Sequence, residues 1–286
     1  MNILIVGGNS ALAKTLIPIL SKSHKISTAG RSYCDFHIDL VDSIENIKIP
    51  DGIDVVINTS AAFLGNNFEQ IYNTESVNAI GALKLCEACN KAKVKHLVMI
   101  SSIFVHLFKD SPQFNIYALS KKHSDELAQL YCKNYELPLT ILRPSQFYGC
   151  GPEQLKNQPF LSSIISKISN NEDITLYGSN DAKRNFIHVE DLAHIISEVI
   201  NKKILGTFDC PGPSNVSYSE LIQSAIRAFK SKSVLKFDTR KPNIPDNIFD
   251  IDNTLYNIIE FTPQITIKVG MEKEALYRSK YNWPQY

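Results

Sequence analysis

Short apolar segments of strand length alternate with helical segments through the first half of the chain, and this pattern restricts the fold more than any other feature. Apolar runs such as "DVVIN" and "LVMIS" are typical of strands buried on both faces of a sheet. Alternating strands and helices predict a parallel sheet with right-handed crossovers. We therefore expect an α/β fold with a Rossmann-like, doubly wound parallel sheet. Strands are predicted at residues 2–6, 24–28, 36–40, 54–60, 95–101 and 138–144, and helices at 10–22, 67–92 and 117–135.

Charge and hydropathy argue against several kinds of partner. The formal net charge of +1 gives no electrostatic reason to expect nucleic acid or an acidic membrane surface. The longest strongly apolar runs, such as "DVVINTSAAF", are shorter than the roughly 20 residues needed to span a bilayer. The chain starts directly with the strand-like "MNILIVGG", without a basic segment or a cleavage site, so we expect a cytoplasmic protein.

The six cysteines do not have the spacing of a metal site. Cys86 and Cys89 form a C-x-x-C pair inside the helical segment "ALKLCEACNKA", and no second ligand pair follows at the spacing of a zinc site. We expect buried helix thiols and no bound metal, and free thiols fit a reducing compartment.

A turn of small residues, "GGNSALA" (7–13), follows the first predicted strand and opens a helix. A strand, a tight turn and a helix N-terminus together form an anion site suited to the pyrophosphate of a dinucleotide. Only the first glycine of the usual fingerprint is present, and Ser10 and Ala13 stand at the positions of the other two. The residues of this turn expected to bind a cofactor are Gly7, Asn9, Ser10, Ala11 and Leu12.

The second predicted strand runs into "STAGRSYCD", where Gly30-Arg31-Ser32 replaces the carboxylate that usually binds the adenosine ribose. A guanidinium beside a hydroxyl suits a 2′-phosphate, so Arg31 and Ser32 favour NADP, with NAD as the alternative. An exposed arginine that binds nothing would fit the same pattern.

The segment "NIYALSK" places Tyr117 four residues before Lys121 at the start of a predicted helix. Positions i and i+4 lie on one face of a helix, so both side chains should point the same way. An ammonium near a phenol stabilises the phenolate, and a lowered phenol pKa would allow acid–base chemistry near neutral pH. About one such pair is expected by chance in this chain, so the spacing alone does not show that Tyr117 and Lys121 have a function.

Eight segments occur in a recognisable order: "GGNSALA", Asp39-Leu40, "INTSAA", "SVNAIGALKLCEAC", "MISS", "YALSK", "LRPSQFYGCGP" and "RNFIHVEDLA". Together they resemble the extended short-chain dehydrogenases/reductases, which form the NAD-dependent epimerase/dehydratase family acting on nucleotide sugars. The matches run along most of the chain. Their order carries the resemblance, and no single motif does.

The resemblance implies three catalytic residues. Tyr117 would exchange a proton with the reacting sugar oxygen, and Ser102 would hydrogen-bond that oxygen. Lys121 would lower the tyrosine pKa and bind the nicotinamide ribose. Other cofactor contacts that the resemblance implies are Asp39, Leu40, Thr59, Ser60, Ala61, Asn78 and Pro144; a capped or surface polar group is the alternative reading of Asn78.

Substrate contacts are also implied by the resemblance. Arg184 and Arg240 resemble arginines that hold the phosphates of the sugar nucleotide, and Ser102 and Gln146 would contact the sugar. Gln146 stands where many members have asparagine, and Asn243 where a carboxylate often follows the second arginine. Both departures leave the nucleobase and the sugar open.

The residues after Ser102 separate the reactions of the family. The 4,6-dehydratases resemble "TDE" here and the 3,5-epimerising reductases carry a cysteine, whereas this chain has Ile103 and Phe104, which cannot transfer protons. Two reactions remain: NADPH-dependent 4-keto reduction of a nucleoside-diphosphate hexulose, which Arg31 favours, and NAD-dependent 4-epimerisation. A non-catalytic NADP-binding protein is less favoured, because Ser102, Tyr117 and Lys121 are all retained.

Two domains are expected from this pattern. Residues 1–147, with about 184–203, would form the dinucleotide-binding domain, and 148–183 with 204–286 a smaller C-terminal α/β substrate cap. By analogy with the family, we expect a homodimer formed through the helix ending near Ala92 and the helix starting at Tyr117. The resemblance implies a setting in the synthesis of surface-polysaccharide precursors.

Overall fold

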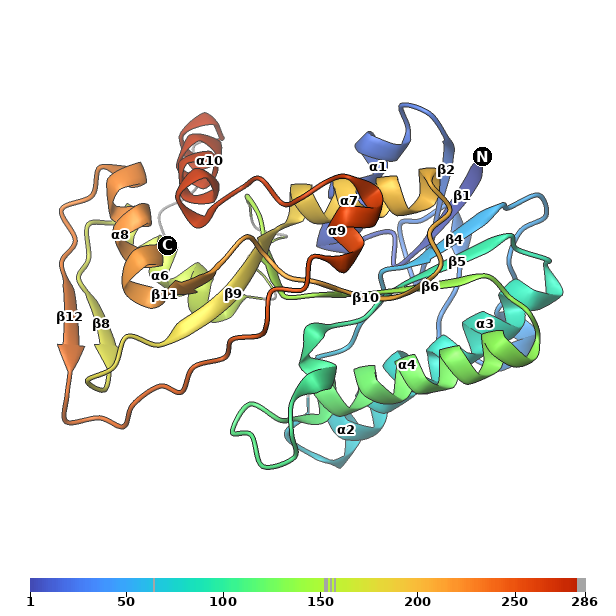
Figure 1. Cartoon of the computed structure of the whole chain (residues 1–286), viewed down its shortest axis with the longest axis horizontal. Helices are drawn as coiled ribbons and strands as arrows, with labels where there is room; N and C mark the ends of the chain where they lie inside the picture. Colours follow the sequence, from blue (N-terminus) through green and yellow to red (C-terminus); the bar gives the residue numbers. More distant parts are fainter. Residues whose placement is uncertain (64, 152–153, 155, 157, 282–286) are drawn as a thin grey trace. The chain divides into compact units, whose positions relative to one another are not determined.

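The computed structural model describes residues 1–63, 65–151, 154, 156 and 158–281, and the chain divides into two compact units (Figure 1). The first unit comprises Met1–Pro144, Ala193–Cys210 and Thr254–Phe261, and the second comprises Ser145–Leu192, Pro211–Asn253 and Thr262–Tyr286.

The first unit is built on a seven-stranded parallel sheet with the strand order β10-β6-β5-β4-β1-β2-β3. The order reverses between β1 and β4, as in doubly wound folds that bind nucleotides at this point. The predicted Rossmann-like parallel sheet is therefore confirmed. Its strands are β1 (Asn2–Val6), β2 (Lys25–Gly30), β3 (Phe36–His37), β4 (Val55–Asn58), β5 (His96–Ile100), β6 (Leu139–Pro144) and β10 (Gly206–Cys210).

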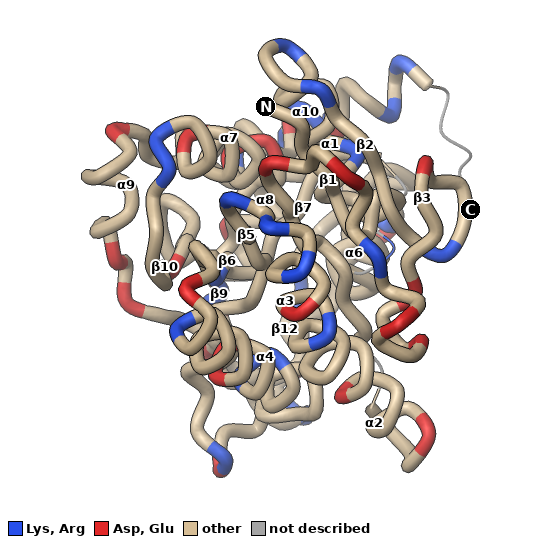
Figure 2. Tube along the Cα trace, turned by 90° about the vertical axis from the view of Figure 1, so that its right-hand side faces the viewer, with Lys and Arg blue, Asp and Glu red and all other residues tan. Residues whose placement is uncertain are grey.

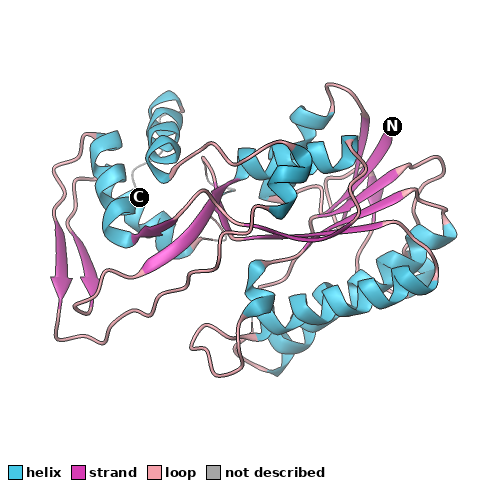
Figure 3. Ribbon diagram, in the orientation of Figure 1, coloured by secondary structure: helices cyan, strands magenta, loops and turns pink. Residues whose placement is uncertain are grey.

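Helices cover both faces of this sheet (Figure 3). One face carries α2 (Phe68–Glu75), α3 (Gly81–Lys91) and α4 (Ile116–Asn134), and the other carries α1 (Ala11–Leu20), α9 (Thr254–Ile259) and residues 193–201 of α7 (Val189–Asn201). All side chains of β4 and β5 are buried, because these central strands have a helical layer on each side.

Two predicted elements differ from those observed. The predicted helix at 67–92 is α2 and α3 joined by a π-helical turn, η2 (Ser76–Ile80). The predicted strand at 36–40 is reduced to the two residues of β3, because the chain turns at Asp39. The Asp39 carbonyl accepts a hydrogen bond from Asp42 N at 3.1 Å, and its carboxylate accepts one from Val41 N at 3.2 Å.

The second unit contains a three-stranded sheet, β11-β9-β7, and a two-stranded sheet, β12-β8. Helix α8 packs against α6 and α10 around a core that includes Leu161, Ile165, Leu221 and Met271. The elements are β7 (Gln146–Tyr148), α6 (Pro159–Ser169), β8 (Ile174–Tyr177), β9 (Lys183–His188), β11 (Asn215–Ser217), α8 (Tyr218–Phe229), β12 (Leu235–Asp238) and α10 (Ile267–Lys280).

The boundaries of the two units follow the pairing of strands, and they differ from the domain boundaries expected from the sequence. β10 pairs with β6 and so belongs to the first unit, whereas β9 pairs with β7 and β11 in the second. Residues close in sequence can therefore belong to different units, since the hydrogen bonds of a sheet join distant segments.

Charged residues of both signs are interspersed along the chain trace (Figure 2), in keeping with the net charge of +1. Within the described ranges, no helix combines the length and the apolar character needed to cross a membrane.

Candidate active site

Gly7 shapes the turn between β1 and α1. Its φ of +81° lies in the left-handed region, which favours glycine. A Cβ atom at Gly7 would lie 2.8 Å from both the backbone nitrogen and Oγ of Ser60, and 2.9 Å from Oγ1 of Thr59. The turn and the end of β4 can therefore approach this closely only because residue 7 has no side chain.

Ser10 joins this turn to the loop after β4. Its hydroxyl caps α1 by accepting a hydrogen bond from Ala13 N at 3.1 Å, and it donates one to Thr59 Oγ1 at 2.9 Å. Thr59 Oγ1 lies 3.0 Å from the carbonyl oxygens of Val6 and Gly7, to which it donates. The two predicted cofactor segments thus meet at the carboxyl ends of β1 and β4, and this geometry fits the pyrophosphate of a dinucleotide.

Ala11 and Leu12 begin α1 with buried side chains, so a ligand contact from either would be made by its backbone amide. Ala61 follows Ser60 in the loop after β4, and both are partly exposed. Pro144 ends β6, where it lies beside Cys210 of β10.

The loop after β2 carries an exposed cation, Arg31, and a carboxylate, Asp35, that is hydrogen-bonded to the strand. Arg31 and Ser32 are exposed, and Asn9 Nδ2 donates a hydrogen bond to the Ser32 carbonyl. Asp35 accepts hydrogen bonds from Thr28 N at 2.8 Å and from Thr28 Oγ1 at 2.9 Å, which hold the pKa of its carboxyl below the usual value. The first carboxylate after β2 is thus engaged by the strand itself, while the guanidinium of Arg31 is exposed.

Asn78 lies in the π-helical turn η2 and is 4% exposed. Its Oδ1 accepts a hydrogen bond from Ala62 N at 2.8 Å, and its Nδ2 donates to the Ala62 carbonyl at 2.9 Å and to Ser120 Oγ at 3.0 Å. Both amide hydrogens are used within the protein. Asn78 therefore joins the loop after β4 to helix α4.

Asp39 and Leu40 lie in the turn after β3. The carboxylate of Asp39 is engaged by Val41 N, and the carbonyl of Leu40 accepts a hydrogen bond from Lys84 Nζ at 3.3 Å. Helix α3 thereby holds the position of this turn.

Ser102 and Tyr117 meet at the carboxyl edge of the sheet. Ser102 follows β5 and caps the short 3-10 helix η3 (Ile103–His106), where its Oγ accepts a hydrogen bond from Phe104 N at 3.3 Å. Tyr117 lies in the first turn of α4. Burial raises the pKa of Tyr117 to about 12, and the nearby Ser102 hydroxyl opposes this rise.

Lys121 lies one helical turn beyond Tyr117 and is 4% exposed. Its Nζ donates a hydrogen bond to the carbonyl of Ile100 at 2.8 Å. Burial lowers the pKa of Lys121 to about 8, and the carboxylate of Asp125 opposes this. The expected lowering of the tyrosine pKa is not found, because burial outweighs the other effects on Tyr117 and the charge of Asp125 adds to the rise.

Two aromatic residues enclose the ring of Tyr117. The Phe63 ring stacks on it, with centroids 5.0 Å apart and planes at 25°, and the Phe104 ring meets it edge-on at 6.4 Å. Sequence reasoning did not find Phe63, since a residue in a loop has no periodicity that shows where its side chain points. The phenol thus has an apolar wall on two sides.

Sequence reasoning also missed a buried ion pair next to Lys121. Asp125 accepts a hydrogen bond from Arg143 Nε at 2.8 Å, and Arg143 Nη1 lies 3.9 Å from Asp209 Oδ1. Asp125 stands four residues after Lys121, so the helical spacing that linked Tyr117 to Lys121 could also have identified it.

Arg184 lies on β9 in the second unit. Its Nη1 donates to the carbonyls of Lys183 and Pro245 at 2.8 Å each, and its guanidinium carbon lies 5.0 Å from the ring centroid of Tyr218. These bonds leave the Nε and Nη2 hydrogens of Arg184 for other acceptors.

Arg240 and Gln146 are also in the second unit. Arg240 forms a bidentate pair with Asp238, Nε to Oδ1 at 2.8 Å and Nη2 to Oδ2 at 3.1 Å, and its side chain is 88% exposed. A phosphate at Arg240 would therefore compete with this carboxylate. Gln146 Nε2 donates to Gln158 Oε1.

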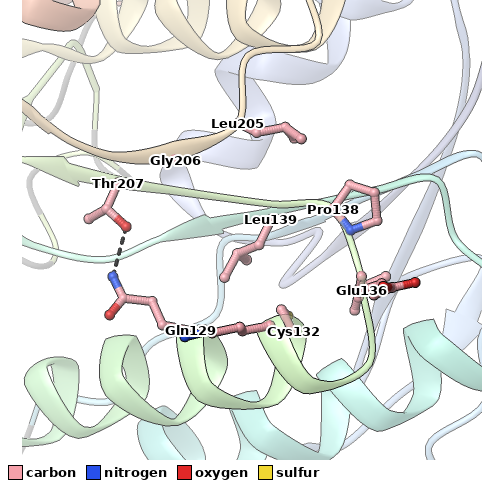
Figure 4. A pocket seen from close by; sticks show the side chains of 10 residues that line it. Gln129, Cys132, Glu136, Pro138, Leu139, Leu205, Gly206 and Thr207 are labelled. Atoms are coloured by element: carbon pink, nitrogen blue, oxygen red, sulfur yellow. Dashed lines mark hydrogen bonds between the residues drawn. The ribbon is translucent and has the colours of Figure 1, made fainter.

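A cavity of about 350 Å³ lies in the first unit at the amino ends of β6 and β10 (Figure 4). Gln129 Nε2 donates a hydrogen bond to Thr207 Oγ1 at 2.8 Å across it. Ser102 and Thr59 follow the carboxyl ends of their strands, so this cavity is at the opposite edge of the sheet from them.

Two curated relatives cover part of the chain. A dTDP-D-glucose 4,6-dehydratase of Dictyostelium discoideum is 26% identical over 191 residues, which cover 59% of this chain and 43% of that protein. A dTDP-4-dehydro-6-deoxy-D-allose reductase of Streptomyces bikiniensis is 25% identical over 163 residues, covering 56% of this chain and 49% of the reductase. The chain thus matches less than half the length of each relative.

Solved structures share the fold over nearly the whole chain. The UDP-glucuronic acid 4-epimerase of Bacillus cereus, in complex with UDP-glucuronic acid and NAD, has a TM-score of 0.80 at 18% identity and covers 98% of this chain and 100% of its own. RMD of Pseudomonas aeruginosa, complexed with NADPH, has a TM-score of 0.81 at 17% identity and covers 98% and 99%.

The sequence pattern of one family extends over most of the chain. This family is described as the NAD dependent epimerase/dehydratase family, and its pattern matches residues 3–208 of this chain. The matched range includes the glycine turn, Ser102, Tyr117 and Lys121. The chain therefore belongs to the NAD-dependent epimerase/dehydratase family.

Proposed function

We propose that the protein is an NADPH-dependent reductase of the 4-keto group of a nucleoside-diphosphate hexulose, acting in the supply of surface-polysaccharide precursors. One observation carries the proposal: the Ser102 hydroxyl lies close enough to the Tyr117 phenol to act on its pKa, and Lys121 lies one turn further along the same helix. Membership of the family supports a nucleotide sugar as substrate, and the Streptomyces relative is a reductase of a dTDP-4-dehydro sugar.

The cofactor would lie along the carboxyl ends of β1, β2 and β4. Backbone amides of the turn that begins at Gly7 would hold the pyrophosphate at the start of α1. The exposed guanidinium of Arg31, with the Ser32 hydroxyl, would hold the 2′-phosphate of NADP, because a guanidinium fork matches phosphate oxygens. NAD is the alternative, and proteins of the same fold have been solved with each dinucleotide.

Tyr117 would be the proton donor. A bound nicotinamide dinucleotide would supply the hydride to C4 of the sugar. The Tyr117 phenol would pass its proton to the carbonyl oxygen and become a phenolate, while Ser102 donates a hydrogen bond to the same oxygen. Tyr117 is protonated at neutral pH, as a proton donor must be. The ammonium of Lys121 would stabilise the phenolate that remains.

The residues after Ser102 support reduction over dehydration. Ile103 is 1% exposed, and Phe104 packs edge-on against Tyr117, so these side chains serve packing. Neither can remove a proton at C5 of the sugar or protonate a hydroxyl leaving from C6.

In the second unit, Arg184, Arg240 and Gln146 would bind the substrate. Arg184 would use the hydrogens of Nε and Nη2 for the diphosphate. Arg240 would share its guanidinium between phosphate and Asp238.

The test is turnover of a nucleoside-diphosphate-4-keto-6-deoxyhexose by the purified protein with NADPH, followed by nicotinamide absorbance. We expect NADPH consumption by the wild type, and a loss of at least about 100-fold in Tyr117→Phe with NADPH binding retained. Interconversion of C4 epimers by protein that retains NAD, without added cofactor, would instead establish the 4-epimerase. NADPH binding without turnover of any sugar nucleotide would indicate a non-catalytic protein.

We further propose a cytoplasmic homodimer that pairs α3 and α4 of each copy. This pairing rests on analogy with the family. The six cysteines, all in described positions, are free thiols, which supports a reducing compartment. Light scattering of the purified protein would give twice the mass of one chain.

A further inference from the structure

A buried carboxylate lies on the same face of α4 as the proposed catalytic lysine. Asp125 is 1% exposed and follows Lys121 by one helical turn. Its Oδ2 accepts a hydrogen bond from Arg143 Nε on β6 at 2.8 Å. Burial raises the pKa of Asp125, and the hydrogen bond from Arg143 and the charges of Arg143 and Lys121 oppose this rise.

Stability alone does not explain this ion pair. Taking two charges out of water costs several kcal/mol per ion, and apolar residues of similar volume often replace such pairs without loss of stability. The site that the pair touches gives a second reason for its presence. Lys121 is the other cation that acts on Asp125.

The pair also connects to the segment that carries Ser102. Arg143 Nη1 lies 3.9 Å from Asp209 Oδ1, and His106 Nε2 lies 2.9 Å from Asp209 Oδ2. His106 ends η3, the short helix that Ser102 caps. One chain of charged side chains therefore runs from Asp125, one turn after Lys121, to the helix that begins after Ser102.

The groups around Lys121 make the charge of Asp125 important for the protonation of Lys121. The groups that act on Lys121 are the Ile100 carbonyl from β5, which accepts its hydrogen bond, and the carboxylate of Asp125 from its own helix. The charged groups next to Asp125 are Arg143 from β6, then Asp209 from β10 and His106 from η3. Among the described charged side chains, Asp125 is the one that favours the charged form of Lys121.

We propose that Asp125, held by Arg143, is a positioning residue of the proposed reaction: its carboxylate keeps the Lys121 ammonium charged and fixed at the end of β5. The proposal rests on the proposed function for its catalytic meaning. The effect on Lys121 can be measured without turnover.

The first test is Asp125→Asn, which removes the charge with little change of shape. Lys121 then loses the carboxylate one turn along its helix, and the charge of Arg143 is no longer offset by Asp125. The lysine should lose its proton at a pH lower by about one unit or more, seen by NMR titration of 13C-lysine-labelled protein with the signal assigned by Lys121→Arg. The alkaline limb of the kcat–pH profile should move in the same direction, and Asp125→Glu should largely restore both.

Two further variants separate positioning from stability. The double variant Asp125→Asn with Arg143→Gln removes both charges of the ion pair and so leaves no guanidinium without its partner Asp125. It should therefore fold and still show the lysine shift. The matched control is Glu274→Gln in the second unit, where Glu274 is 2% exposed and accepts a hydrogen bond from Arg278 Nε at 2.8 Å. This control should lose stability without moving the Lys121 titration or the kcat–pH profile.

An unchanged Lys121 titration in the folded double variant would overturn the proposal and leave the ion pair a structural one. If the titration moves as expected while the wild type turns over no sugar nucleotide, the positioning of Lys121 stands and the proposed function fails.

Discussion

The ring of Phe63 stacks on the ring of Tyr117, with centroids 5.0 Å apart and an interplanar angle of 25°. An aromatic pair contributes about 0.5–1.5 kcal/mol beyond area burial, so the stack should help to orient the phenol. We expect Phe63→Ala to lower kcat by roughly 3- to 10-fold with the keto sugar and NADPH, and Phe63→Tyr to keep most of it. Phe108→Ala removes an 80% exposed phenylalanine and is the control. Equal rates in the two alanine variants would show that the stack has no part in turnover.

Cofactor preference should depend on Arg31. A hydrogen bond to a charged group contributes about 1.5–3 kcal/mol, so Arg31→Ala should raise KM for NADPH by about 10- to 100-fold and leave KM for NADH nearly unchanged. Lys25→Ala removes a cation at the opposite end of the same strand and should change neither KM. Parallel changes of both KM values in Arg31→Ala would contradict binding of the 2′-phosphate.

The structure contains a matched pair of glycines for testing the turn. Gly7 and Gly52 both have positive φ, +81° and +76°, but a Cβ atom at Gly52 would meet nothing nearer than Asn2 Nδ2 at 3.9 Å. Gly52→Ala should reduce the free energy of unfolding by about 1–2 kcal/mol through its conformation alone. Gly7→Ala adds contacts of 2.8 Å, so it should cost about 1–3 kcal/mol more and abolish NADPH binding. Urea unfolding and fluorescence titration with NADPH measure the two effects. If Gly7→Ala lost no more stability than Gly52→Ala, the residues after β4 would shift to make room for the Cβ atom at little energetic cost.

The protein should become less stable as the pH is lowered, because a buried histidine resists protonation in the folded state. His96 is 5% exposed in β5, with Nε2 2.8 Å from Thr140 Oγ1, and burial lowers its pKa to about 4 from 6.5. Between these two values the unfolded chain binds more protons than the folded chain. The contribution of neutral His96 is therefore complete above pH 6.5 and is lost as the pH falls towards 4, by up to about 3 kcal/mol.

The measurement is urea unfolding of wild type and His96→Gln at about pH 7.5 and about pH 4.5. His96→Gln should be less stable at the higher pH and lose less stability on acidification. His37→Gln, at a side chain that is 67% exposed, should keep the wild-type dependence. Identical pH dependence in wild type and His96→Gln would show that another group is responsible.

The sequence was more informative about the sheet of the first unit than about the side chains around Tyr117. Strands buried on both faces leave continuous apolar runs, so β4 and β5 could be located from composition alone. β3 ended early because Asp39 turns the chain, a contact between neighbours that no periodicity reveals.

The proposed catalytic residues and the side chains around them differ in the same way. Tyr117 and Lys121 were found through their helical spacing, and Asp125 shares that spacing but has a charge that sequence reasoning assigns to the surface. Arg184 illustrates the limit, because it bonds the carbonyl of Pro245, a residue far along the chain in an irregular segment. Partners of this kind follow from the tertiary fold alone.

The last strand of the large sheet also restricts how this protein can be divided. β10 covers the whole of one side of β6, from Gly206 beside Thr140 to Cys210 beside Pro144. A fragment that stopped at residue 144 would leave the backbone amides and carbonyls of that side without partners, next to the apolar Ile141 and Leu142. Such an open edge is a template for aggregation. The part of the first unit that ends at β6 therefore needs β10, from much later in the chain, to pair with its last strand.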